Sequence, residues 1–452
     1  QRRISCSVWP LSMGRQQRGL PETKPGKKLA ASKPAASKPA ASKPAASRVQ
    51  AQTAQARGGA APRGDGVEGP GAADASQVSL PPPLPDGEDL LRPIDDLAAV
   101  RECYERYGVV GVTGVLSAAE CQALLTEGIE PFLPAGCRMD SVETFGLADA
   151  SVNRFGVIGK SALFNPAVLA ARVHPNVAAA YSSVYGRGDV YAGHDRAAWM
   201  RPAAVDPSWA TPFSWPGLHL DISLRGYFEG NRSEVDGFLA SIDYSCGNFA
   251  AENNAKHASM GRTVQGVLSL YDNDEEDGGF QCVPGMFGPP LQRWAQLHGG
   301  LPEPEVNGKY VLKGYGPDAQ LGKLAVRLPC PAGTLILFDA TLPHGTRPSA
   351  SCRPRAVLFL RYLSSDELPA EAWESRNAAL RRAAAEAGFE PDERQARFLY
   401  GGPRAASEDD GPEHEGRTEA EPPRDGAPAA SEAEPERRHP GRAGGVSRWC
   451  IQ

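Results

Sequence analysis

The residues most suggestive of chemistry are a histidine and an aspartate two positions apart, in His219-Leu220-Asp221. The chain of 452 residues has eight histidines, and only His219 is followed by a carboxylate at this offset. Side chains at positions i and i+2 of a strand lie on one face, so this pair can bind one metal ion. The motif alone is also typical of an exposed polar strand face, so a metal site requires a further ligand elsewhere.

His344 is the candidate for that further ligand. It follows the apolar run Thr334 to Phe338, and Arg355 opens a second apolar run eleven residues later. Two histidines and one carboxylate form a facial triad that leaves three positions of octahedral iron open. The cosubstrate 2-oxoglutarate would occupy two of these positions, and oxygen or water the third. A simple turn residue before Gly345 is the alternative interpretation of His344.

Arg355 is the candidate anchor for the far carboxylate of 2-oxoglutarate. A carboxylate inside a barrel requires a planar, always charged partner, which arginine supplies through a bidentate pair. Arg355 begins an apolar strand, so its side chain can point into the barrel. Thr346, two residues after His344, can add a hydroxyl to the same carboxylate. The alternatives are a solvated basic cluster or a neighbouring arginine, namely Arg347, Arg353 or Arg361.

Charge and composition divide the chain into three parts. Residues 1–64 carry a net charge of +12 and residues 403–452 carry −4, so the middle is strongly acidic, which argues against a nucleic-acid surface there. Residues 30–47 repeat the unit Ala-Ala-Ser-Lys-Pro, which cannot bury apolar surface. We predict disordered segments at 1–85 and 403–452 and one folded domain at 86–402.

Cysteine usage and hydropathy bear on the compartment. The nine cysteines are scattered, odd in number and never form a C-x-x-C pair, which is typical of free thiols in a reducing compartment. No apolar run approaches the roughly 18 to 20 residues that cross a bilayer. We therefore expect a soluble, intracellular protein, cytoplasmic or organellar. The chain opens with Gln1-Arg2-Arg3 rather than Met, and this basic start is typical of either a transit peptide or a disordered arm.

The predicted elements favour a mainly β fold with flanking helices. A helix is expected over 97–107, a strand over 109–112, and a second helix after the capping-box residues Ser117 and Glu120. Short strands follow at 264–270, 326–328, 334–339 and 355–363, and a closing helix at 372–387 ends before Gly388. Short strands with irregular connections and no βαβ rhythm indicate an antiparallel sandwich or barrel of the jelly-roll type.

Five motifs in sequence order resemble the phytanoyl-CoA dioxygenase family of non-haem iron oxygenases. They are His219-Leu220-Asp221, Gln265 to Tyr271, Gly278 to Gly285, Ala332 to Phe338, and His344-Gly345-Thr346 with Arg355. The segment Tyr107 to Leu125 is similar to the family's N-terminal region, so the resemblance spans roughly 97–363. It implies a double-stranded β-helix (jelly-roll, cupin-like) core, with Fe(II) at His219, Asp221 and His344 and 2-oxoglutarate at Arg355.

The resemblance also implies an activity. The chain would be a 2-oxoglutarate-dependent dioxygenase that hydroxylates a small organic substrate or acyl conjugate, releases succinate and CO2, and uses ascorbate as reductant. A non-catalytic jelly-roll binding protein is one alternative, and the intact triad and Arg355 argue against it. A protein hydroxylase that recruits a partner through its basic N-terminal arm is the other. The sequence leaves the substrate and the oligomeric state open.

Two further segments depart from simple expectations. The 43 residues between Asp221 and Gln265 are longer than the family pattern and predict an insertion at about 225–260. The run 272–277, here called the acidic loop, invites a calcium-loop interpretation, but it lacks the glycine and terminal glutamate of an EF-hand. A solvated turn between strands is the expected structure of this loop.

Overall fold

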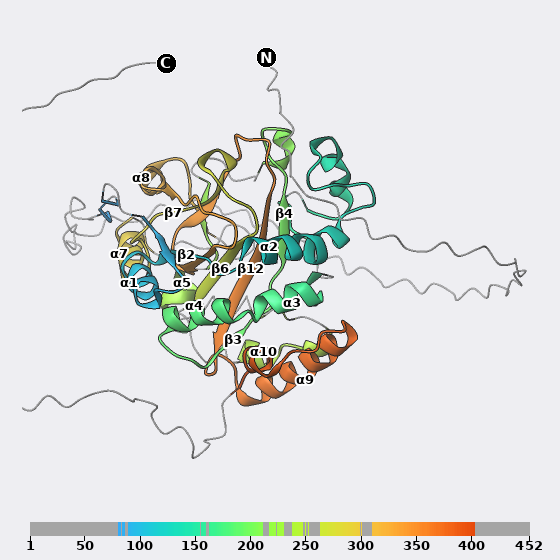
Figure 1. Cartoon of the computed structure of the whole chain (residues 1–452). Coiled ribbons are helices and arrows are strands. Elements are labelled where there is room, and N and C mark those ends of the chain that lie inside the picture. Colours follow the sequence, from blue (N-terminus) through green and yellow to red (C-terminus); the bar gives the residue numbers. More distant parts are fainter. Residues whose placement is uncertain are drawn as a thin grey trace, which may run out of the picture. The chain divides into compact units, whose positions relative to one another are not determined.

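The computed structural model describes residues 80–402 except for 83, 86–88, 154, 160–161, 211–216, 223, 230–236, 247–248, 250–251, 253–262, 299 and 301–309. The chain divides into two units at Pro403, and every described residue belongs to the first (Figure 1). Nearly all of the two predicted terminal segments, and part of the predicted insertion at 225–260, lie outside the described residues.

The larger of two sheets runs in the order β1-β2-β10-β6-β12-β3, and β4 pairs with β12 beside this path. All of its pairs are antiparallel except β1 with β2. The long strand β12 joins three neighbours and crosses the middle of the unit in Figure 1. The strands are β1 (Leu91–Pro93), β2 (Val109–Thr113), β3 (Val190–Ala192), β4 (Ala197–Met200), β6 (Val264–Ser269), β10 (Leu335–Asp339) and β12 (Arg355–Ser364).

The smaller sheet runs in the order β8-β5-β11-β7-β9, and all of its pairs are antiparallel. Its strands are short because glycines and prolines interrupt the sequence between them. They are β5 (Leu218–Leu220), β7 (Gly279–Cys282), β8 (Tyr310–Val311), β9 (Val326–Arg327) and β11 (His344–Arg347).

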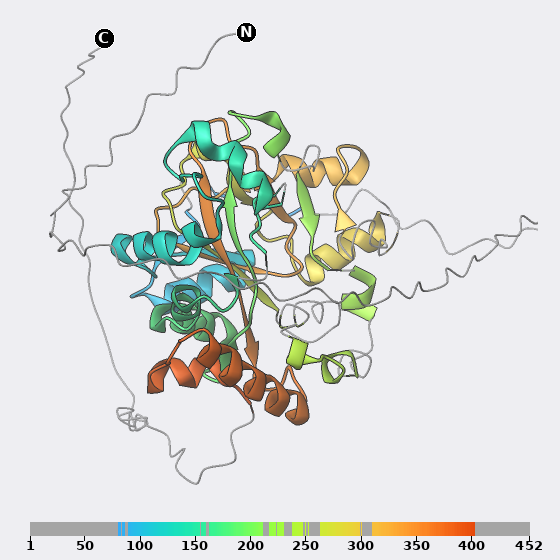
Figure 2. The same cartoon turned by 90° about the vertical axis from the view of Figure 1, so that its right-hand side faces the viewer.

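Helices cover the outer face of the larger sheet, as the turned view of Figure 2 also shows. In α4 (Pro175–Tyr185), Tyr181 stacks on Tyr362 of β12 with ring centroids 4.3 Å apart. A side chain at Gly266 of β6 would collide with the Tyr181 hydroxyl, so the glycine permits this close packing. The other helices are α1 (Leu97–Tyr107), α2 (Ala118–Ala123), α3 (Pro166–Arg172), α5 (Leu224–Glu229), α7 (Pro289–Leu297), α8 (Gly316–Lys323), α9 (Ala370–Glu386) and α10 (Glu393–Leu399).

The inner face of the larger sheet is turned toward the smaller sheet. Phe338 of β10 lies with its ring centroid 4.9 Å from that of Phe280 on β7 and 4.5 Å from that of His344 on β11. Because side chains alternate along a strand, the residues in register with Phe338 share this inner face. The space between the sheets is therefore bordered by one face of each sheet.

Solvent reaches part of this inner face. Phe338 is in register with Gln265, and Gln265 with Arg361; Val267 and Phe359 form the next row. Gln265, Val267 and Phe359 are only half-buried, although they lie in the middle of the sheet. The alternate residues of β6, which face the helices, are buried. The space between the sheets is thus not completely filled by side chains near these positions.

Several predicted elements are confirmed. The first helix spans Leu97–Tyr107 as predicted and ends at Gly108, whose φ of 70° suits glycine. Ser117 and Glu120 form the predicted capping box at the start of α2. The closing helix is followed by Gly388 with φ of 72°. These elements follow from local signals, which the sequence carries directly.

The fold is mixed α/β with two antiparallel sheets, and so contains more helix than the mainly β expectation. Helices α3 and α4 account for much of the difference, and both start with a proline at the first helical position. Asn165 and His174 cap them with side-chain acceptors. Both segments are rich in alanine, so the sequence does not show which face of each helix is buried. Packing against the sheet defines that face.

The expectation that every cysteine is a free thiol is wrong at Cys352, which is disulfide-bonded. Five others, Cys103, Cys121, Cys137, Cys282 and Cys330, are free and buried. Spacing along the sequence does not reveal which distant cysteines meet in space, which is why the scattered pattern misled. Among the described helices, none is long and apolar enough to cross a membrane.

Candidate metal centre

Strands β5 and β11 bring two histidines side by side. His344 is in register with His219, and their ring centroids are 4.6 Å apart. Leu218 and Leu220, on either side of His219, are fully buried in an apolar cluster that includes Trp294 of α7. Because side chains alternate along β5, burial of the two leucines turns His219 to the opposite side.

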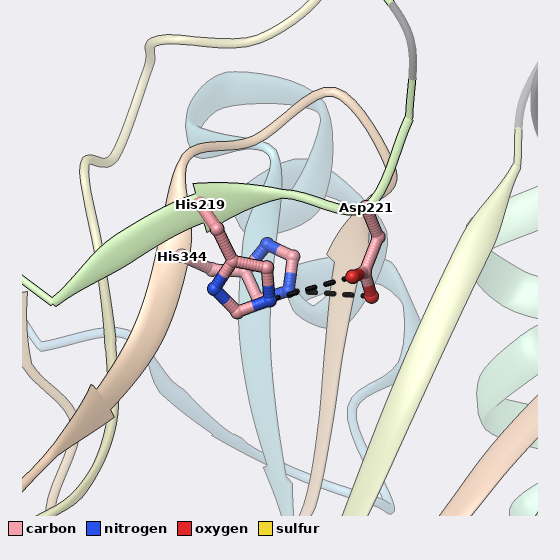
Figure 3. A group of neighbouring side chains, drawn as sticks. All are labelled: His219, Asp221 and His344. Atoms are coloured by element: carbon pink, nitrogen blue, oxygen red, sulfur yellow. Dashed lines mark ion pairs between the residues drawn. The ribbon is translucent and has the colours of Figure 1, made fainter. Parts of the chain in front are cut away.

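Asp221 follows directly after β5 and completes a triad with the two histidines (Figure 3). Its Oδ1 lies 3.4 Å from Nε2 of His219, and its Oδ2 lies 3.8 Å from Nε2 of His344. One ligand atom from each of the three residues lies within 4.8 Å of the others. Neighbouring ligands about 2.1 Å from one ion are separated by about 3 Å, so the three groups need only small rotations to share a metal.

A hydrogen bond fixes the ring orientation of His344. Its Nδ1 lies 2.8 Å from the backbone carbonyl oxygen of Leu342. A carbonyl only accepts, so Nδ1 carries the proton and Nε2 presents its lone pair toward Asp221. Metal-binding histidines are commonly oriented by such a contact on the second nitrogen. Two imidazole nitrogens and one carboxylate, held in this way, are a donor set that fits Fe(II).

A pair of glycines allows β5 and β11 to approach. A Cβ on Gly345 would collide with the carbonyl oxygen of Gly217. Gly217 precedes β5 with φ of 71°, a conformation that glycine adopts without strain. The close approach of the two backbones holds His219 beside His344.

Two phenylalanines flank His344, and the sequence did not single them out. The ring of Phe280 on β7 is nearly parallel to that of His344, with centroids 6.1 Å apart, and the tilted ring of Phe338 on β10 lies 4.5 Å from His344. Both are buried. Strand register identifies Phe280 as a neighbour of the site. Phe280 is opposite Thr346 on β11, and Thr346 shares a strand face with His344. Thr346 itself is half-buried.

Arg355 begins β12 and is half-buried. Burial and, to a lesser extent, the charge of Arg327 lower the pKa of Arg355 to about 10, whereas Asp277 opposes this shift. The guanidinium group still carries its charge at neutral pH. In the part of the chain that the structure describes, Arg355 forms no ion pair with a carboxylate.

The three alternative arginines have other surroundings. Arg347 is exposed to solvent. Arg353 pairs with two aspartates of the acidic loop, with nitrogen to oxygen distances of 2.6 Å. Arg361 is buried and pairs with Glu367 at 2.9 Å. Of the four, Arg355 is the half-buried cation without a carboxylate partner among the described residues.

Comparison with known proteins gives one informative relative. No protein-family model matches the chain. Over 267 residues the chain is 28% identical to a putative phytanoyl-CoA dioxygenase of Dictyostelium discoideum, covering 58% of this chain and 73% of that protein.

Solved structures show a looser likeness. GlcNAc Inducible Gene 2 of Candida albicans matches with a TM-score of 0.44 and 15% identity over 70% of this chain and 76% of that one. The epimerase SnoN, solved with Fe3+, alpha ketoglutarate and nogalamycin RO, matches with a TM-score of 0.38 and 16% identity, covering 60% and 84% of the two chains.

Two histidines and an aspartate gathered on one antiparallel sheet, beside the inner face of another, are the arrangement of the two-histidine, one-carboxylate class. Within that class, the sequence similarity is to the putative phytanoyl-CoA dioxygenase of Dictyostelium discoideum. The resemblance drawn from the five sequence motifs is thereby confirmed.

Proposed function

We propose that the chain is an Fe(II)- and 2-oxoglutarate-dependent dioxygenase that hydroxylates a small organic substrate or acyl conjugate and releases succinate and CO2. The observation that carries this proposal is the geometry of His219, Asp221 and His344, whose ligand atoms lie within 4.8 Å of one another. Arg355 supports it, because a half-buried guanidinium without a carboxylate partner among the described residues is suited to an anionic cosubstrate.

We also propose that the two sheets form a double-stranded β-helix. The strands β4, β12, β6 and β10 lie in the larger sheet, and β5, β11, β7 and β9 in the smaller. The strands β4, β5, β6 and β7 alternate between the two sheets, and so do β9, β10, β11 and β12. The short strand β8 comes between these two runs and lies in the smaller sheet. Alternation of this kind is typical of jelly-roll folds.

The chain's own residues divide the work in the proposed reaction. Fe(II) with 2-oxoglutarate and oxygen supplies the oxidising chemistry when these groups are bound. His219, Asp221 and His344 would hold the metal, and Arg355 would orient the cosubstrate through its far carboxylate, with a hydrogen bond from the Thr346 hydroxyl. Phe280 and Phe338 pack around His344 and exclude water from that side of the site.

The test is iron-dependent conversion of 2-oxoglutarate to succinate by the full chain, with ascorbate as reductant. A panel of small organic acids, acyl conjugates and peptides identifies compounds that stimulate this conversion. We expect His219→Ala or Asp221→Ala to abolish it while the circular dichroism spectrum stays unchanged, because apolar packing holds β5 and β11. His298→Ala, which changes an exposed histidine directly after α7, is the matched control.

Each negative outcome has a distinct meaning. Full succinate formation in either triad variant would remove the site assignment. Wild-type protein that binds the metal but never consumes 2-oxoglutarate would favour the non-catalytic binding protein. Stimulation by peptides alone would favour a protein hydroxylase.

A further inference from the structure

Gln265 is a polar residue on the inner face of the larger sheet. It lies on β6, in register with Phe338 of β10 on one side and with Arg361 of β12 on the other. A Cβ at the next residue, Gly266, would collide with the Tyr181 hydroxyl of α4, so Gly266 faces the helices. Because side chains alternate along a strand, Gln265 faces the smaller sheet, which carries the two histidines of the triad.

Phe338 connects Gln265 to the candidate metal centre. The ring centroid of Phe338 lies 4.5 Å from that of His344. Directly opposed residues on neighbouring antiparallel strands have Cβ atoms about 4.5–5.5 Å apart, so the side chains of Gln265 and Phe338 are neighbours on one face. Gln265 therefore lies next to a side chain that flanks a metal ligand.

Gln265 is distant from Arg355 on the same face. Its partner Arg361 comes six residues after Arg355 along β12, which corresponds to about 20 Å at the rise of a strand. Arg355 is the proposed partner of the far carboxylate of 2-oxoglutarate. A group that contacts Gln265 is therefore separate from that carboxylate, and this end of the face is left for the substrate.

The surroundings of Gln265 favour an uncharged ligand with an apolar body. Val267 and Phe359 form the next row of the inner face, and both are half-buried like Gln265 itself, so solvent reaches all three. The side chain of Arg361 is 4% exposed and pairs with Glu367 at 2.9 Å, so the charge beside Gln265 is already neutralised. A charged group brought onto this surface would lose water without gaining a counter-ion.

The amide of Gln265 can recognise a group that both donates and accepts hydrogen bonds. A glutamine side chain accepts through its carbonyl oxygen, donates through its NH2 group and carries no charge. A hydroxyl or a carboxamide also donates and accepts, so either can form hydrogen bonds with this amide. A plain alkyl chain would offer the amide nothing in exchange for the water that it displaces.

We propose that Gln265 determines substrate specificity, by binding an uncharged hydroxyl or carboxamide group of a substrate whose apolar part lies against Val267 and Phe359. This inference rests on the proposed function, because that function supplies the reaction for which the substrate is bound. The sequence carries no direct signal of this role, because the neighbours of Gln265 are fixed only when β6 pairs with β10 and β12.

The test measures the binding of four probes that share a six-carbon chain and differ at one end. 1-Hexanol and hexanamide are uncharged, hexanoate is an anion, and hexylamine is a cation at neutral pH. Each probe is titrated without oxygen into the full-length protein loaded with Fe(II) and 2-oxoglutarate, through the change in visible absorbance of the iron chelate. We expect the wild type to bind both uncharged probes at least about tenfold more tightly than either charged probe.

Three variants complete the design. Gln265→Leu removes the amide with little change in volume, so it should weaken binding of the uncharged probes by about threefold to tenfold, the usual range for one neutral hydrogen bond. Its binding of the charged probes should not change. Gln265→Asn keeps the amide on a shorter stem, so it should bind the uncharged probes less tightly than the wild type but still prefer them. Gln320→Leu, which changes an exposed glutamine on α8, is the matched control and should bind all four probes like the wild type.

The possible failures are distinguishable. Wild-type protein that forms the 2-oxoglutarate chelate but shows no preference for the uncharged probes, or binds none of the four, would overturn this inference and leave the proposed function intact. The same holds if Gln265→Leu binds every probe as the wild type does, or loses affinity equally for all four. If Gln265→Leu does not fold, unchanged binding of the uncharged probes by Gln265→Asn would overturn the inference instead. Wild-type Fe(II) protein that does not bind 2-oxoglutarate would overturn the proposed function and this inference together.

Discussion

At the scale of the residue, the partners of each arginine decide which one can bind an anion. Four arginines lie between residues 347 and 361, and the sequence favoured Arg355 because it opens an apolar strand. The structure commits Arg353 to the acidic loop and Arg361 to Glu367, and it leaves Arg347 in solvent. A guanidinium that already neutralises a carboxylate has little attraction left for a second one, so Arg355 remains the best candidate.

We predict that Arg355→Ala raises the 2-oxoglutarate concentration needed for half-maximal succinate formation by about tenfold to a hundredfold, the usual range for a charge-assisted hydrogen bond. Iron should remain bound, because the triad is unaffected, and metal analysis of the anaerobic protein checks this. Arg347→Ala is the control and should behave like the wild type. An unchanged requirement in Arg355→Ala would transfer the anchor to Arg353 or Arg361.

At the scale of the element, the distance between β5 and β11 sets the geometry of the triad. We predict that Gly345→Ala weakens Fe(II) binding by at least about tenfold, because the new methyl group meets the Gly217 carbonyl oxygen and must push the strands apart. Equilibrium dialysis without oxygen measures the affinity. Gly146→Ala is the control, since a Cβ at that exposed glycine meets nothing within 4 Å. Unchanged affinity in Gly345→Ala would show that the strands tolerate separation.

A buried ion pair joins α9 to a residue of the predicted insertion. Nε of Arg376 lies 2.5 Å from Oε1 of Glu252, and both side chains are at most 1% exposed. The backbone carbonyl oxygen of Glu252 also accepts a hydrogen bond from Arg361 at 2.6 Å. The insertion is thus fixed, at this point, to the closing helix and to the inner face of β12.

We predict that Arg376→Met lowers the free energy of unfolding by about 3–5 kcal/mol, because it leaves the Glu252 carboxylate buried and unpaired. Urea denaturation measures this change. Adding Glu252→Met should recover much of the loss, since two apolar side chains of similar volume can replace a buried pair. A loss below about 1 kcal/mol for the single variant would mean that water reaches Glu252 and solvates its charge.

At the scale of the whole molecule, metal binding is expected to couple to folding. The three ligands come from distant parts of the chain, and only the folded state gathers them. A metal at about a hundred times its dissociation constant stabilises the folded state by about 2.7 kcal/mol. We predict that removing the metal with a chelator lowers the thermal midpoint by a few degrees. Asp221→Ala should show the same midpoint with and without metal, and a shift in that variant equal to the wild type would contradict the site.

Much of the architecture could be predicted from local signals. The helix at Leu97–Tyr107, the capping box at Ser117 and the strands β6, β9, β10 and β12 were expected close to their observed bounds. The helices α3 and α4 were not assigned, because alanine-rich segments show no strong apolar stripe until a sheet covers one face. The disulfide at Cys352 was missed for a related reason, since pairing depends on proximity in space.

The sequence by itself determined the types of residue available for the chemistry: a histidine and an aspartate on one strand face, a histidine after an apolar strand, and an arginine that opens another. Tertiary structure alone decided that β5 and β11 pair with His219 opposite His344, and that Arg353 and Arg361 pair with carboxylates. The physical reason is that strand alternation is a local property of the chain. Register between distant strands is set by burial of whole faces and by the few glycines that let backbones touch.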